Sequence, residues 1–346
     1  MSDFDAKTAA QAEMFANRLK KRFTHLKKWA RRSGIEAYRL YDRDIPEIPL
    51  VLDLYGDTVS GALYKRPYEK DEAEESNWID CMRDAAVIGL GINRENIIIK
   101  RRERQYGNSQ YEKRAGRELI REIKEENFKF KVNLSDYLDT GLFLDRRILR
   151  RIVREDAADK SVLNLFCYTA SFSLYAAGGG AVSTDSVDLS NTYLGWAKEN
   201  FSLNGYKAEL LHINEFFSGN RDRPKNSHRL IRADVPLFLR KAAEAGLRRD
   251  LIILDPPAFS NSKMAGNDFD LQKDYINLLS NCLSLLSPGG KLWFSVSSRS
   301  FKSGASRLEV LLSGKFPGLQ INDISEKTVD EDFRGRKIPK TFLLSI

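Results

Sequence analysis

The sequence predicts an α/β protein in two parts: a small α+β domain over residues 1–134 and a mostly parallel, helix-covered sheet over residues 135–346. Two observations support this prediction. In the second part, short apolar runs alternate with segments of helical periodicity, which is the pattern of βαβ units. In the first part, apolar and polar residues alternate between turn signals, which is typical of antiparallel strands. A chain of 346 residues is long enough for both domains.

Composition favours a globular protein with an anionic partner. Hydrophobic residues make up 42% of the chain, and 56 Lys and Arg against 48 Asp and Glu give a net charge of +8. Three scattered cysteines, Cys81, Cys167 and Cys282, are too few for a disulfide framework or a zinc site, so we expect a cytoplasmic protein without a metal. No signal peptide is visible. The uncharged stretch 161–184 contains polar residues and three consecutive glycines, so a strand, a turn and a helix are expected there rather than a membrane span.

The first element is an amphipathic helix. Apolar residues recur every three to four positions from Phe15 to Ala30, and Gly34 is a natural end. No acidic residue occurs between Ala16 and Arg32, and eight positive charges on one helix repel one another unless an anion is near. A solvated face is the alternative, but we expect contacts with RNA or DNA phosphates, made by Arg18, Lys20, Lys21, Arg22, Lys27 and Lys28.

Short antiparallel strands are expected over residues 36–64, followed by a helix over 77–90 and a strand over 96–100. Residues 100–117 form a second basic block that also contains tyrosines. Such a loop suits phosphate contact and base stacking, although a plain exposed loop has the same composition. A strand over 128–134 closes this part. The arginines expected to contact RNA here are Arg101, Arg102 and Arg104.

The second part alternates strands and helices. In a parallel sheet of this kind, ligands bind at the carboxyl ends of the strands. Residues 210–227 are expected to form a surface loop. The expected strands are 162–166, 181–187, 229–232, 251–254 and 291–296, and the expected helices are 172–177, 191–203, 236–245 and 271–286.

Acidic residues follow three of these strands. The turn after the first strand has no GxGxxG pattern, which argues against a dinucleotide-binding loop. Asp188 follows the second strand, about 20 residues beyond that turn, where an acid can accept both hydroxyls of a ribose. Asp234 follows the third strand, and Asp255 opens an Asp-Pro-Pro after the fourth. Each aspartate alone can be a helix cap, but three in order favour a site at this edge.

This ordered set resembles the S-adenosylmethionine-dependent methyltransferases with a Rossmann-like, seven-stranded class I sheet. More closely, it is similar to the large-subunit (23S) ribosomal RNA guanine-N7 methyltransferases, over nearly the whole chain. In many bacteria that enzyme is one half of a bifunctional protein that also makes N2-methylguanine. The other half is not in this sequence, so no N2 activity is expected. The similar segments are Thr140–Asp145, Asn164–Phe166, Val187–Ser190, Asp255–Lys263 and Asp332–Arg334.

The resemblance implies S-adenosyl-L-methionine as cofactor and ribosomal RNA or a large-subunit precursor as substrate, with no membrane partner. The turn 166–171 would wrap the methionine part, Asp188 would bind the ribose, and Asp234 with Val235 would face the adenine. Residues expected at the transfer site are Asp255, Pro256, Pro257 and Phe259, the last either stacked on an extruded guanine or a core aromatic. The expected cofactor-binding residues are Phe143, Asp145, Arg147, Asn164, Phe166, Tyr168, Thr169, Ala170, Ser171, Asp188, Leu189, Ser190, Asp234, Val235 and Asp255.

Three alternatives to N7 methylation have different requirements. A cytosine-C5 enzyme needs a cysteine nucleophile, and no cysteine follows the fourth or fifth expected strand, whereas Cys167 and Cys282 look structural. Methylation of an exocyclic amine stays open because Asp-Pro-Pro can accept an N–H. A non-catalytic RNA-binding assembly factor would not bind the cofactor. N7 of guanine carries no proton, so its methylation needs no general base.

Overall fold

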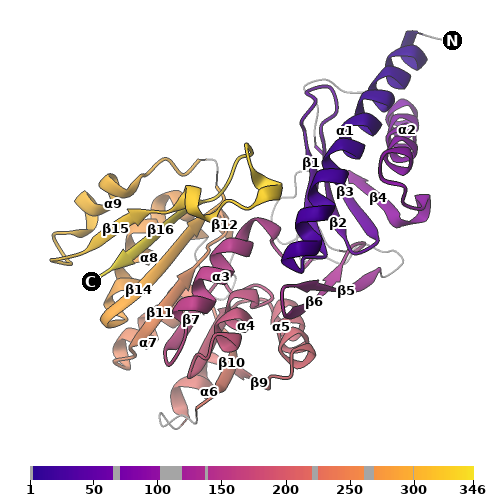
Figure 1. The fold of residues 1–346 in the computed structure, drawn as a ribbon. Helices are drawn as coiled ribbons and strands as arrows, with labels where there is room; N and C mark the ends of the chain where they lie inside the picture. Colours follow the sequence, from indigo (N-terminus) through magenta and orange to yellow (C-terminus); the bar gives the residue numbers. More distant parts are fainter. Residues whose placement is uncertain are drawn as a thin grey trace. The chain divides into compact units, whose positions relative to one another are not determined.

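The computed structural model describes residues 3–64, 71–101, 119–136, 139–219, 225–260, 269–298 and 300–346. The chain divides into two compact units, Met1–Thr140 with Glu331–Arg336, and Gly141–Asp330 with Lys337–Ile346 (Figure 1). This division differs from the domain boundary expected at residue 134 in two ways: the first unit continues to Thr140, and it also includes Glu331–Arg336. Residues up to Thr140 stay with the first unit because the Thr140 hydroxyl bonds to Tyr55 Oη at 2.7 Å.

The first unit packs two helices and a four-stranded sheet of order β1-β2-β3-β4. The predicted helix at 77–90 begins earlier, because Asp71 accepts hydrogen bonds from the backbone of Ala73 and Glu74. Hairpin strand β5 was not expected. The elements are α1 (Asp3–Ser33), β1 (Ala37–Asp42), β2 (Leu50–Tyr55), β3 (Thr58–Leu63), α2 (Glu72–Leu90), β4 (Ile97–Arg101), β5 (Ile120–Glu125) and β6 (Phe128–Asn133).

Helices α1 and α2 approach each other backbone to backbone. A Cβ on Gly89 of α2 would lie 2.6 Å from the carbonyl oxygen of Ala16 in α1, so only glycine fits there. Phe15, Leu19 and Leu26 of the apolar stripe of α1 are fully buried. Most basic residues of α1 lie on its exposed side, whereas Arg18 and Arg22 are half-buried.

The C-terminal segment Glu331–Arg336 returns to the first unit. Asp332 is buried there and accepts a hydrogen bond from the backbone N of Arg39 at 2.9 Å. The Arg39 guanidinium lies over the Phe333 ring at 5.0 Å, and Arg336 pairs with Asp44 at 2.8 Å. The motif Asp332–Arg334 thus holds a distant part of the chain on the first unit, which separates it from the rest of the predicted second domain.

The second unit is built on a sheet of eight described strands in the order β15-β16-β14-β11-β7-β8-β10-β9. Strand β16 is antiparallel to both neighbours, and the others, apart from edge strand β15, pair in parallel. The bounds are β7 (Ser161–Leu165), β8 (Ser183–Asp188), β9 (Ala208–His212), β10 (Ser227–Arg232), β11 (Arg249–Leu254), β14 (Leu286–Val296), β15 (Gln320–Asp323) and β16 (Lys340–Ser345).

The Rossmann-like sheet predicted for this part is present, and it has eight described strands where seven were expected. The prediction of a surface loop over residues 210–227 was wrong for residues 210–218, and residues 220–224 lie outside the described residues. Strand β9 begins at Ala208 and adds an outer edge beside β10, and helix α6 (Ile213–Ser218) follows it directly. The hydrophobic pattern does not predict β9, because its residues are half-exposed or exposed and it lacks the continuous apolar run of a buried strand.

Helices cover both faces of the sheet, as the βαβ rhythm predicted (Figure 1). One face packs on α7 (Val235–Glu244), α8 (Leu271–Ser284) and α9 (Ala305–Leu312). The other packs on α3 (Arg147–Asp156) and α4 (Ser171–Gly178), and α5 (Asn191–Leu203) contacts α4. None of the helices described is long and apolar enough to cross a bilayer. The uncharged stretch 161–184 forms β7, α4 and the start of β8, as expected.

Candidate active site

The predicted site residues follow neighbouring strands of the large sheet. Strands β10, β8, β7 and β11 are adjacent and parallel, so their carboxyl ends share one edge. Asp188 ends β8, Asp234 comes two residues after β10, and Asp255 directly follows β11. The turn after β7 lies at the same edge. The topology therefore brings the three aspartates and the turn together.

The turn after β7 has an unusual backbone. Phe166, Tyr168 and Ala170 have φ values of 56°, 53° and 56°, a left-handed conformation that side chains other than glycine rarely adopt. Strain of this kind persists only where surrounding contacts hold it. Here the Thr169 hydroxyl donates to the Gly141 carbonyl at 2.6 Å, and the Asn200 amide donates to the Thr169 carbonyl at 3.2 Å. These contacts hold the turn in this conformation.

Gly141 also sets how closely the aromatic residues approach this turn. Its φ is 106°, and a Cβ there would lie 2.4 Å from Trp196 Cζ2. The ring of Tyr168 lies 4.5 Å from that of Tyr193 and 5.1 Å from that of Phe143, centroid to centroid. The side chain of Phe143 is 42% exposed. An aromatic wall therefore borders the turn, with Phe143 at its open side.

Asp188 is the most perturbed acid at this edge. Burial raises its pKa to about 6, while hydrogen bonds from the backbone N–H groups of Ser190, Tyr168 and Leu189 oppose that rise. The Tyr168 amide donates to one carboxylate oxygen at 2.9 Å and the Ser190 amide to the other at 3.0 Å. An ionised carboxylate can accept several hydrogen bonds on each oxygen, so these backbone donors leave room for further donors. Ribose hydroxyls are donors of the kind that this carboxylate would accept.

Asp234, Asn164 and Ser190 play structural parts. Asp234 caps α7 by accepting from the Leu237 amide at 3.0 Å, and neighbouring Val235 is buried in the core. Asp234 therefore forms the helix N-cap that was the alternative for each of the three aspartates. Asn164 is buried and donates to the Ser173 hydroxyl at 2.9 Å, which ties β7 to α4. The Ser190 hydroxyl caps α5, and Leu189 and Ser171 are half-buried beside these residues.

Asp255 is paired with an arginine that sequence analysis did not select. Arg146 donates to both oxygens of Asp255, at 2.8 and 2.9 Å, and to the Ser297 hydroxyl at 2.8 Å. Asp145 lies 3.1 Å from the same guanidinium. Arg146 is buried, which lowers its pKa, but the attraction of Asp255 and Asp145 outweighs that effect, and the pKa rises.

The neighbouring Arg147, expected among the cofactor-binding residues, points elsewhere. Its side chain is fully buried and donates to Asp330 at 2.8 Å. Arg146 ends the short 3₁₀ segment Leu144–Arg146 and Arg147 begins α3, and consecutive helical residues point about 100° apart. Only one of the two can face Asp255. Two arginines in a row signalled a basic residue here, but not which one points to the sheet edge.

The Asp-Pro-Pro segment leads away from the core. Pro256 is buried, whereas Pro257 is exposed and Phe259 is 50% exposed, so Phe259 is not a core aromatic. Phe259–Ser260 forms β12, which pairs with β13 (Phe269–Asp270). The motif residues Asn261–Lys263 lie outside the described residues.

The basic residues expected to contact RNA differ in how far they are engaged within the protein. Arg18 pairs with Asp44 at 2.7 Å, and half-buried Arg22 donates to the carbonyls of Leu40 and Asp332 at 3.4 and 3.2 Å. Arg101 lies 3.4 Å from Glu75. The side chains of Lys20, Lys21, Lys27 and Lys28 are exposed. Arg102 and Arg104 are not among the residues described.

A largely parallel sheet with this strained turn, an aspartate at the end of β8 and an Asp-Pro-Pro after β11 is the arrangement of a Rossmann-like methyltransferase. The sequence model of the S-adenosylmethionine-dependent methyltransferases matches residues 61–304, and the chain belongs to this family. S-adenosyl-L-methionine is therefore its cofactor. The carboxylate of Asp188 and the strained turn after β7 fit that molecule.

Individual relatives refine this assignment. The chain is 45% identical to the ribosomal RNA large subunit methyltransferase K of Neisseria meningitidis, covering 97% of this chain and 88% of that one. It is 42% identical to the K/L protein of Pseudomonas fluorescens, but spans only 41% of that protein's length. A crystal structure of a methyltransferase complexed with SAH aligns with a TM-score of 0.71 and 26% identity, over 97% of this chain and 82% of that one.

Proposed function

We propose that this protein transfers a methyl group from S-adenosyl-L-methionine to N7 of a guanine in 23S ribosomal RNA. The relatives named above as large-subunit ribosomal RNA methyltransferases support the substrate class. The bidentate pair between Arg146 and Asp255 is the observation that supports N7 as the acceptor atom.

The two kinds of acceptor atom differ in whether a proton must be removed. Guanine N7 carries a lone pair and no proton. Its methylation therefore requires that the guanine be well positioned, but it requires no general base to remove a proton. An exocyclic amine must instead lose a proton, which requires a free acceptor beside it. Asp255 has both carboxylate oxygens engaged by Arg146, and its side chain is only 14% exposed. A carboxylate neutralised in this way suits positioning better than proton removal.

The positions of the residues at this edge of the sheet support a role for each of them. S-adenosyl-L-methionine supplies an activated methyl group on a sulfonium when it is bound. Asp188 binds the ribose hydroxyls, the turn 166–171 surrounds the methionine part, and Phe143 and Asp145 border the same edge. Half-exposed Phe259 is free to stack on a guanine that leaves its base stack.

The acceptor atom can be tested with modified RNA. Purified protein is incubated with labelled S-adenosyl-L-methionine and a 23S ribosomal RNA transcript, and the products are mapped by mass spectrometry. We expect 7-methylguanosine at one position. A matched transcript in which 7-deazaguanosine replaces guanosine should accept no methyl group, because it has carbon in place of N7. Equal labelling of the two transcripts would show that an exocyclic amine or a pyrimidine is methylated, and lack of cofactor binding in calorimetry would favour an assembly factor.

The cysteines give a second test. Cys167 and Cys282 are buried, and burial raises the pKa of both thiols, which opposes the thiolate that a C5 enzyme needs. We expect the Cys81→Ser, Cys167→Ser, Cys282→Ser variant, if folded, to keep methyl transfer within about tenfold of wild type, since buried hydroxyls cost some stability. A variant that binds cofactor normally but transfers no methyl group would point to covalent catalysis.

A further inference from the structure

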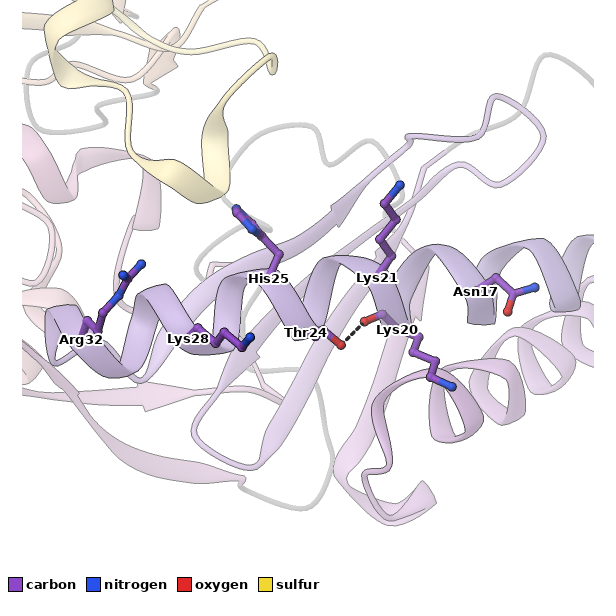
Figure 2. A pocket seen from close by; sticks show the side chains of 7 residues that line it. All are labelled: Asn17, Lys20, Lys21, Thr24, His25, Lys28 and Arg32. Atoms are coloured by element: carbon purple, nitrogen blue, oxygen red, sulfur yellow. Dashed lines mark hydrogen bonds between the residues drawn. The ribbon is translucent and has the colours of Figure 1, made fainter.

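One face of α1 carries cations together with uncharged hydrogen-bonding groups. Its side chains line a surface hollow of about 510 Å³ (Figure 2). All of them are exposed. We call this set the basic face: Asn17, Lys20, Lys21, Thr24, His25, Lys28 and Arg32.

The structure separates these cations from the other basic residues of α1. Arg18 and Arg22 are engaged within the first unit, and Lys27 lies over the Phe23 ring at 5.2 Å. His25 is the member of the basic face that has an acidic neighbour, Glu331, at 2.8 Å. Within the described part of the chain, no carboxylate lies within ion-pair distance of the face's three lysines or of Arg32.

Helix geometry arranges these charges in a line. Lys20, Thr24, Lys28 and Arg32 are spaced four residues apart, so they lie on one stripe with a rise of about 6 Å per step and a span of about 18 Å. Lys21 and His25 lie beside the stripe. Like charges at this spacing destabilise a helix unless a partner neutralises them. The face thus has the length and sign to follow several groups of a polyanion.

We propose that the basic face of α1 binds the sugar–phosphate backbone of the RNA substrate, an inference that rests on the proposed function. The lysines and Arg32 neutralise phosphates, while Asn17 and Thr24 supply uncharged hydrogen-bonding groups suited to sugar and phosphate oxygens. A lipid surface fits less well. Helices that bind membranes insert an apolar face, and the apolar face of α1 is buried inside the first unit.

Salt dependence tests this binding directly. Log K falls as log salt concentration rises, and each lost phosphate contact makes this fall less steep by about 0.7 for single-stranded RNA. For the full chain and a 23S ribosomal RNA transcript, the Lys20→Gln, Lys21→Gln, Lys28→Gln variant should reduce the steepness of the slope by about 2. The matched control removes three exposed lysines elsewhere, Lys7→Gln, Lys124→Gln and Lys225→Gln, and should change it by well under 1. Calorimetry should give both variants wild-type affinity for S-adenosyl-L-methionine.

Two outcomes would overturn the proposal. One is an equal loss of steepness for both variants, which would mean that only net charge matters. The other is wild-type RNA binding by the first variant combined with its loss of binding to phosphatidylglycerol vesicles, which would assign the face to lipid. Neither outcome depends on the acceptor atom. Failure of the N7 assignment with 7-deazaguanosine RNA is therefore distinguishable from failure of this binding surface.

Discussion

Replacing Asp188 with alanine is expected to weaken binding of S-adenosyl-L-methionine by about 10²-fold or more. Two ribose hydroxyls would lose a charged acceptor, and hydrogen bonds to charged groups contribute about 1.5–3 kcal/mol each. The substitution also removes the acceptor of two hydrogen bonds, which the backbone N–H groups of Tyr168 and Ser190 donate to the Asp188 carboxylate. Isothermal titration calorimetry measures the affinity, and unchanged binding would remove Asp188 from the cofactor site.

The raised pKa of Asp188 gives that prediction a second, independent readout. In the protein without cofactor, this carboxyl becomes protonated as the pH falls through about 6. Hydroxyl donors favour the ionised form, so the proton must leave when the cofactor binds. Affinity should therefore be full above pH 6 and fall below it, by up to about tenfold per pH unit. Asp188→Asn keeps one acceptor oxygen but cannot titrate, so its weaker affinity should be flat between pH 5 and 7.

The sequence predicts where the aspartates of this site lie, but not what each of them contacts. Asp188, Asp234 and Asp255 could be placed on one edge because parallel strands end together, and the structure places them there. Their separate tasks could not be predicted. Asp234 caps a helix, whereas Asp255 pairs with an arginine more than a hundred residues earlier in the chain. Such pairing depends on tertiary packing, which local patterns do not encode.

The N-terminal helix shows the same limit for charge. Periodicity predicts its buried face, because apolar spacing is local. Which of its cations are free depends on Asp44 and on the returning segment around Asp332, neither of which is near in sequence to Arg18 or Arg22. Strand β9 was missed for a related reason: half-exposed edge strands carry little hydrophobic pattern. Long-range partners and edge positions are therefore what the structure adds.

Replacing Arg146 with methionine should destabilise the protein by about 3–5 kcal/mol, because it leaves Asp255, whose side chain is only 14% exposed, unpaired beside Asp145. Urea unfolding measures this loss. The double variant Arg146→Met, Asp255→Leu removes both charges and should recover much of the stability, since apolar replacement of a whole buried pair is often neutral. Arg248→Met, at an exposed arginine of the same unit, is the control and should stay within about 0.5 kcal/mol of wild type.

Methyl transfer should not recover with stability in that double variant. If the pair holds the Asp-Pro-Pro segment where the guanine must sit, both Arg146 variants lose that placement, and a shift of about 1 Å at a reacting centre can cost about 10²-fold in rate. Single-turnover transfer to the 23S ribosomal RNA transcript, at saturating cofactor and RNA, separates this loss from weaker binding. A double variant that is stable and transfers methyl at the wild-type rate would show that the pair serves folding alone. A stable double variant with slow transfer would assign to Arg146 and Asp255 the positioning of the base.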